Sequence, residues 1–198
     1  MVEISAELVK QLRTQTGAGM MDCKKALAES GGDMEKAVEF LRKKGLATAQ
    51  KRAGRQTNQG VVQSYIHLGG KLGVMVEINC ETDFVAKSDA FLEFAKNIAM
   101  HIAAANPLAV RPEEVPADIM AKEREIYMAQ ARETGKPEKV LEKIVDGKVS
   151  KFLKDVCLMN QQYVRNPDIT ITDYMHDLIA KTGESVTIRR FVRYQLGE

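Results

Sequence analysis

The feature that most constrains the fold is a change in the spacing of apolar residues at Gly60. Before this position they recur at helical intervals, whereas residues 62–68 and 74–78 show the alternation of two strands. The intervening Gly69-Gly70-Lys71 predicts a hairpin turn, because glycine reaches positive φ without steric cost. The chain is therefore expected to place a helical segment before a part that contains a sheet.

Residues 1–45 predict three short helices. Ser5, Asp22 and Asp33 are each suited to the N-cap of one helix, because a short polar side chain can accept a hydrogen bond from the first turn. Gly45 follows a basic last turn and is expected to end the third helix in a left-handed conformation. Helices this short form a small core, so we expect a separate N-terminal module.

Residues 46–59 are basic and polar, and we interpret them as a connector with helical character over its first half. The wider basic segment 42–55 leaves open an RNA-associated role, which predicts a steep dependence of binding on salt. A solvated linker is the commoner role for such a charge run. The lack of clustered aromatic residues also weakens the RNA interpretation.

Residues 60–198 predict an α+β core, a small antiparallel sheet with helices packed on it. After the hairpin the pattern turns helical through 91–102, and a strand at 185–195 closes the chain. Further helices are expected at 117–134, at 138–146, at 148–158 and from Thr172 to Gly183. The predicted domains are thus a helical module at 1–45, a basic linker at 46–59 and the core at 60–198.

Composition argues against several kinds of function. The net charge is only +2, which gives no global signal for binding nucleic acid. Cys23, Cys80 and Cys157 are far apart, which fits core residues in a reducing cytoplasm better than disulfides or a metal site. No signal peptide or membrane-spanning apolar run is apparent. We expect a cytoplasmic protein that is not an enzyme and needs no metal or cofactor.

The first stretch that indicates a contact with another molecule is TGAGMM at 16–21. Met20 and Met21 are adjacent, and neighbouring residues cannot both face the core of a short helix, so at least one is expected at the surface. A flexible, polarizable side chain is suited to docking on a partner. The alternative is that both methionines fill the ends of a small helical bundle, and the residues fit either interpretation.

The second stretch is EINCETDFVAKSDAF at 77–91. Thr82 or Asp83 can cap a helix, with Phe84 and Val85 packed beneath it. Alternatively, Ser88 caps the long helix, and residues 82–85 form a protruding corner from which Phe84 projects. A projecting aromatic that becomes buried in a partner is a common binding hot spot. The residues alone favour the first alternative slightly.

Both stretches resemble signature sequences of the elongation factor Ts family, namely LRTQTGAGMMDCKKAL at 12–27 and EINCETDFVAK at 77–87. The resemblance implies a helical module similar to ubiquitin-associated domains and a single partner, elongation factor Tu, in its GDP-bound and nucleotide-free forms. It also implies acceleration of GDP release. Thr82, Asp83, Phe84 and Val85 match the motif that disturbs the partner's Mg²⁺ and nucleotide site.

The same resemblance implies that Arg13, Met20 and Met21 hold the partner's GTPase domain. Longer relatives have a core of two similar lobes, whereas this chain has room for one, so a homodimer is expected. The remaining alternative is a helical binding module for a different protein, which explains TGAGMM but leaves TDFV unexplained.

Overall fold

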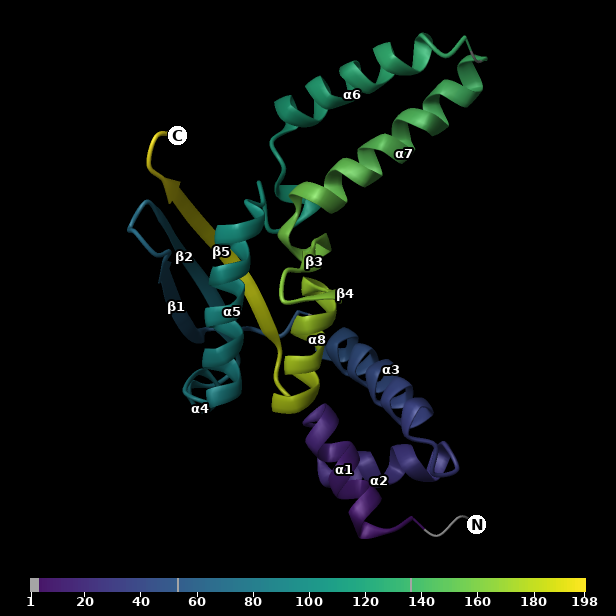
Figure 1. Cartoon of the computed structure of the whole chain (residues 1–198), viewed down its shortest axis with the longest axis vertical. Coiled ribbons are helices and arrows are strands. Elements are labelled where there is room, and N and C mark those ends of the chain that lie inside the picture. The colour runs from purple at the N-terminus through teal and green to yellow at the C-terminus, as the bar shows by residue number, and fades with distance from the viewer. Residues whose placement is uncertain (1–3, 53, 136) are drawn as a thin grey trace. The chain divides into compact units, whose positions relative to one another are not determined.

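The computed structural model describes residues 4–52, 54–135 and 137–198. Helices combined with a small sheet confirm the predicted α+β class (Figure 1). In chain order, the elements are α1 (Ala6–Thr16), α2 (Met20–Glu29), α3 (Met34–Arg52), β1 (Gln59–Ile66), β2 (Leu72–Cys80), α4 (Asp83–Ala86), α5 (Asp89–Ala105), η1 (Pro112–Glu114), α6 (Ala117–Arg132), α7 (Glu138–Val156), η2 (Leu158–Asn160), β3 (Gln162–Tyr163), β4 (Asn166–Thr170), α8 (Ile171–Thr182) and β5 (Val186–Gln195).

These elements form two compact units. The first consists of Met1–Val62, Glu77–Ala95 and Asp173–Thr187, and the second consists of Gln63–Val76, Lys96–Thr172 and Ile188–Glu198. The strands of the main sheet, in the order β1-β2-β5, each contribute residues to both units.

In the first unit, α1, α2 and α3 enclose a small apolar core, as the periodicity predicts. Ser5 caps α1 by accepting a hydrogen bond from the Leu8 amide at 3.2 Å, and Asp33 accepts one from the Lys36 amide at 3.1 Å at the start of α3. The buried residues of this core are Val9, Leu12, Cys23, Ala26, Leu27 and Ala37.

The predicted cap of the second helix is wrong. α2 begins at Met20, with Gly19 as its N-cap, so Asp22 lies inside the first helical turn. The Asp22 carboxylate instead accepts a hydrogen bond from the ammonium of Lys44 in α3, at 2.6 Å. A contact between helices has therefore replaced the expected local cap.

Gly45 does not end the third helix, because α3 continues to Arg52. The first half of the predicted connector at 46–59 is therefore helical. A Cβ atom added at Gly45 would lie 3.2 Å from the Cβ of Ala180 in α8, which is closer than most carbon atoms approach. The glycine thus allows two helices of the first unit to pack closely, and this contact outweighs the modest cost of glycine within a helix.

In the second unit, α6 and α7 run side by side as an antiparallel pair (Figure 1). We expected two helices at 138–146 and 148–158, but α7 is continuous from Glu138 to Val156. Leu141, Val145 and Val149 keep one buried face across Gly147, which itself is exposed. Packing of that face against α6 outweighs the roughly 1 kcal/mol cost of an interior glycine.

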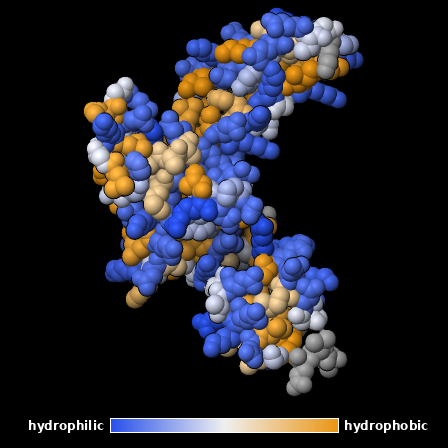
Figure 2. All heavy atoms as spheres, in the orientation of Figure 1, coloured by the Kyte–Doolittle hydropathy of each residue, from blue (hydrophilic) through white to orange (hydrophobic). Residues whose placement is uncertain are grey.

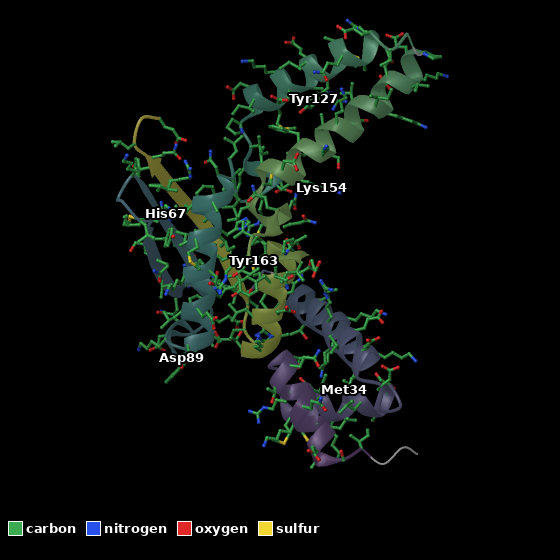
Figure 3. All side chains as sticks on the ribbon, viewed as in Figure 1. Met34, His67, Asp89, Tyr127, Lys154 and Tyr163 are labelled. Carbon is green, nitrogen blue, oxygen red and sulfur yellow. The ribbon has the colours of Figure 1, made fainter. Side chains whose placement is uncertain are left out.

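Polar contacts also join this pair of helices. Arg124 and Asp146 form an ion pair at 2.8 Å, and the Lys148 ammonium donates to the Gln130 side chain at 2.6 Å. The same ammonium lies 5.6 Å from the centroid of the Tyr127 ring, whose position on α6 is labelled in Figure 3. These exposed contacts set the register of the two helices, and the buried apolar face supplies most of the stability.

The end of the chain follows the prediction closely. α8 stops at Thr182, and Gly183 has φ of 71° and donates its amide to the carbonyl of Ile179. Its start differs, because the Thr172 hydroxyl bonds the Met159 carbonyl at 2.6 Å and lies within the helix. The strand predicted at 185–195 is β5, and its end meets the start of β2, where the Leu196 amide bonds the Lys71 carbonyl at 2.8 Å.

His101 is fully buried in the second unit and has two hydrogen-bond partners. The amide nitrogen of Gln161 donates to the Asp155 carbonyl at 2.7 Å, so its side-chain oxygen is the acceptor for His101 Nε2 at 2.9 Å. The Val164 amide donates to His101 Nδ1 at 3.3 Å. The ring is therefore the neutral tautomer with its proton on Nε2, and burial lowers the pKa of His101.

This arrangement predicts that acid destabilises the protein. A histidine whose folded-state pKa lies below its ordinary 6.5 binds a proton more readily in the unfolded chain. The stability that the neutral His101 ring contributes is complete well above pH 6.5 and is lost as the pH falls below 6.5. Between pH 7.5 and 5.5, the free energy of unfolding should fall by up to about 1.4 kcal/mol from this group alone.

Urea denaturation of the wild type and of His101→Gln at both pH values measures this loss. Glutamine keeps one donor and one acceptor without titrating, so the variant should lose less stability between the two values. Burial also lowers the pKa of His176. Because His176 is present in both proteins, it does not contribute to the difference between them. Equal losses in the two proteins would contradict the assignment to His101.

Candidate partner-binding site

The corner at residues 82–88 joins the buried strand β2 to the long helix α5. Thr82 is extended, with φ −124° and ψ 156°, and caps the one-turn helix α4 by accepting a hydrogen bond from the Val85 amide at 3.4 Å. Ser88 then accepts one from the Phe91 amide at 3.4 Å, at the start of α5. Asp89, labelled in Figure 3, is the first residue of that helix. Both capping residues considered in the sequence are therefore used.

Phe84 does not pack beneath the corner. Its side chain is 82% exposed, whereas Ala86 is buried and Val85 is partly buried. The favoured sequence interpretation, with Phe84 inside, is wrong, because Ser88 starts a second helix and leaves α4 only four residues long. A helix of one turn can bury only one side, and Phe84 lies on the other.

Asp83 lies next to Phe84 and is also exposed. Its carboxylate pairs with the Lys87 ammonium at 2.7 Å across one helical turn. The hydrogen bond from Lys87 lowers the pKa of Asp83, so the carboxylate is charged. An ion pair this exposed adds little to stability, and either group remains available to another protein.

Glutamates from two separate parts of the first unit fix the corner. The Glu184 carboxylate accepts hydrogen bonds from the Thr82 amide at 3.0 Å and from the Thr82 hydroxyl at 2.6 Å. The Glu81 carboxylate accepts one from the Ser185 amide at 2.6 Å. Sequence reasoning missed both glutamates, since Thr82 and Glu184 are 102 positions apart and no local pattern joins them.

The turn between α1 and α2 presents the other predicted residues. Gly17 has φ of 68° and ends α1 by donating its amide to the Arg13 carbonyl at 2.7 Å. Met20 and Met21 begin α2 and are 58% and 74% exposed. Of the two interpretations left open, exposure of the methionines is therefore correct, and the Arg13 side chain is exposed as well.

The surface of the N-terminal helices includes hydrophobic side chains among hydrophilic ones, as Figure 2 shows. Exposed apolar residues beside a basic side chain are typical of protein-binding surfaces. The structure thus presents Phe84 and the two methionines on different segments of the same compact unit.

Two kinds of site considered from the sequence are a metal site and a reactive cysteine. No group of three or more His, Cys, Asp and Glu side chains among residues 4–52, 54–135 and 137–198 is arranged to hold a metal ion. Burial raises the pKa of the Cys80 thiol to about 11, so it remains protonated, and it donates to the Thr82 carbonyl at 3.1 Å. In that same part of the chain, every helix is too short or too polar to cross a lipid bilayer.

Comparison with known proteins decides the family. The family model described as "Elongation factor TS" matches residues 3–198. The chain belongs to the elongation factor Ts family. It is 64% identical over 195 residues to "Elongation factor Ts" of Desulfosudis oleivorans, covering 98% of each chain. It is also 64% identical over 198 residues to the protein of that name from Solidesulfovibrio magneticus, covering 100% of this chain and 99% of the other.

A third relative, "Elongation factor Ts" of Desulforamulus reducens, is 62% identical over 198 residues, which are 91% of its length. Likeness over nearly whole chains confirms the resemblance suggested by the two signature stretches. It also confirms the elongation factor Ts role, which is nucleotide exchange on elongation factor Tu.

The exposure of Phe84 predicts that its removal leaves stability almost unchanged. Phe84→Ala should alter the free energy of unfolding by no more than about 0.5 kcal/mol, because the side chain has few contacts to lose. Phe91→Ala is the matched control: that ring is fully buried in α5, and its loss should cost about 3–5 kcal/mol. Thermal and urea unfolding of both variants measure this, and a large loss for Phe84→Ala would contradict the exposed position.

Proposed function

We propose that this chain accelerates GDP release from elongation factor Tu by inserting the corner at Thr82–Val85 beside the partner's Mg²⁺ and nucleotide. The observation that supports this most is the 82% exposure of Phe84 on a turn fixed by caps at Thr82 and Ser88. Phe84 acts as the wedge between elements of the partner. Asp83 brings a negative charge to the region where Mg²⁺ balances the phosphate charge.

An exchange factor works by binding the nucleotide-free partner more tightly than the nucleotide-bound partner. Reciprocity then requires it to weaken nucleotide binding by the same factor. Shifting the partner almost wholly between the two states takes about 5.5 kcal/mol of differential binding. Burying one phenylalanine supplies roughly 1.5–3 kcal/mol, so other contacts are needed.

Arg13, Met20 and Met21 are the proposed source of those other contacts. Their exposed side chains flank one turn, where two polarizable thioethers and one cation suit a partner surface that is partly apolar and partly acidic. In this proposal, residues 1–45 hold the partner, residues 46–59 connect, and the core at 60–198 displaces the nucleotide. The protein acts without catalytic residues or cofactor, in the cytoplasm, and binds no nucleic acid or membrane.

The exchange reaction itself tests this function. Release of a fluorescent GDP analogue from purified elongation factor Tu should be many-fold faster with the wild-type chain. Phe84→Ala should reduce that acceleration by roughly tenfold or more, as expected when a hot-spot side chain that contributes at least about 2 kcal/mol is removed.

Phe91→Ala is unsuitable as a control here because it affects folding, so Val140→Ala on the exposed side of α7 is used instead. Equal acceleration by Phe84→Ala and the wild type would remove the wedge assignment but keep the function. No acceleration by the wild type would reject the function and favour a helical binding module for a different partner.

The sheet supports a second part of the proposal, that two copies of this chain associate. Arg193 in β5 donates to the Ala103 carbonyl of α5 at 3.5 Å, so α5 lies on the face of the sheet to which Arg193 points. Because side chains alternate along a strand, Val192 and Tyr194 point to the opposite face. Val74 in β2 is buried, so its neighbour Gly73 faces away from the core, and Ile66 shares that outer face because a Cβ at Gly73 would lie 3.0 Å from Ile66 Cδ1. The exposed apolar residues of this face and its margins include Val62, Ile66, Leu68, Met75, Val192, Tyr194 and Leu196.

Exposed apolar residues on one face of a sheet are typical of an interface, and the same face on a second copy would cover them symmetrically. Sedimentation should therefore detect a dimer. Val192→Glu should shift it toward monomer, because the interface would bury a charge. Val140→Glu is the matched control, since Val140 on α7 is 39% exposed and Val192 is 41% exposed. A strictly monomeric wild type at high concentration would contradict the proposal.

A further inference from the structure

We infer that Glu184 is a positioning residue for nucleotide exchange, acting through Thr82 on the exposed Phe84. The inference rests on the proposed role of the 82–85 corner, and it concerns a residue outside both signature stretches. Glu184 lies between α8 and β5, in the same compact unit as the corner.

The Glu184 carboxylate fixes the orientation of the Thr82 hydroxyl. Glu184 Oε1 accepts the hydroxyl proton at 2.6 Å, and Glu184 Oε2 accepts from the Thr82 amide at 3.0 Å. With its proton directed at Glu184, the hydroxyl oxygen presents a lone pair to the Val85 amide at 3.4 Å. The cap of α4 is therefore oriented by Glu184, and hydrogen bonds to a charged acceptor are stronger than neutral ones.

Glu81 makes the reciprocal contact, from the residue before Thr82 to the residue after Glu184. Glu81 Oε1 accepts from the Ser185 amide at 2.6 Å, so each of two adjacent pairs, 81–82 and 184–185, supplies a carboxylate to the backbone of the other. Glu81 also pairs with Arg52 at 3.3 Å and with Arg55 at 3.2 Å. The hydrogen bond from the Ser185 amide is the main cause of a lowered pKa at Glu81, which is thus ionised.

Apolar packing holds α4 only weakly. A four-residue helix is too short to be stable by itself. Ala86 is the only side chain of α4 that is buried, and Phe84 adds almost no packing. Without Glu184 the corner would sample several conformations, and binding would have to restrict them before Phe84 could enter the partner. Glu184 therefore restricts the corner to one conformation when the chain folds, before the partner binds.

The test uses the full chain, purified elongation factor Tu and a fluorescent GDP analogue. Glu184→Ala should slow the maximal accelerated release about tenfold or more, because it removes both charge-assisted hydrogen bonds to Thr82. Glu184→Gln should be intermediate, because its amide oxygen can still accept one of the two hydrogen bonds. Glu142→Ala, which removes an exposed glutamate of α7, should match the wild type.

Two further measurements distinguish positioning from loss of folding. Amide hydrogen exchange at Thr82 should accelerate in Glu184→Ala, while exchange at Leu27 and Ile102, in the cores of the two units, stays unchanged. In a double-mutant cycle, Glu184→Ala should slow release by less than about twofold when Phe84→Ala is already present, because there is no ring left to position.

The outcomes separate the inference from the function. If Phe84→Ala slows release but Glu184→Ala does not, the positioning role is overturned and the proposed function stands. The same tenfold loss with and without Phe84 would also overturn it, since Glu184 would then act independently of the ring. If Phe84→Ala has no effect, the wedge itself fails, and with it the role inferred for Glu184.

Discussion

A phenylalanine that is proposed to enter another protein must be kept out of its own core, and at residues 82–88 hydrogen bonds do this more than packing. The corner has one buried side chain, Ala86, and a helix of a single turn. Its conformation depends on acceptors that surround it: Thr82 and Ser88 at the two helix starts, and the carboxylate of Glu184 behind Thr82. Directional contacts allow an apolar side chain to remain in water, whereas an apolar contact would have drawn it inward.

The same separation of tasks occurs in the N-terminal helices. Cys23 and Leu27 of α2 are buried and stabilise the helical core, whereas Met20 and Met21, on the first turn of that helix, are exposed. Residues that stabilise the unit and residues proposed to bind the partner are therefore different residues on one element. Such an arrangement allows binding residues to be chosen for the partner at small cost to folding, which matters when the net stability of a domain is only about 5–15 kcal/mol.

Local pattern predicted the elements well and their ends less well. The hairpin, the long helix α5 and the strand β5 follow from periodicity that the local residues alone supply. Glycine was harder to interpret: Gly183 ends α8 as expected, but Gly45 and Gly147 lie inside helices. Gly45 lies inside α3 where the helix packs closely against Ala180, and Gly147 lies inside α7 where the buried face of the helix continues on both sides of it. Asp22 likewise bonds Lys44 instead of its own helix. These outcomes depend on contacts between distant segments, which no local pattern contains.

The candidate site illustrates this limit and also suggests why the two segments proposed to bind the partner occur in one compact unit. Exposure of Met20 and Met21 was left open by the sequence, exposure of Phe84 was judged the less favoured alternative, and Glu184 had no signal at all. Glu81 contacts Arg52, the last residue of α3, and also the Ser185 backbone beside the corner. The helix α3, which packs against α2 in one apolar core, is therefore linked through charged hydrogen bonds to the residues beside Phe84. Binding energy gained at a remote contact can offset the cost of an unfavourable insertion elsewhere on the same protein, most directly when the two contacts are held together. Glu81 provides such a connection between the N-terminal helices and the corner, so the segments proposed to bind the partner can act together.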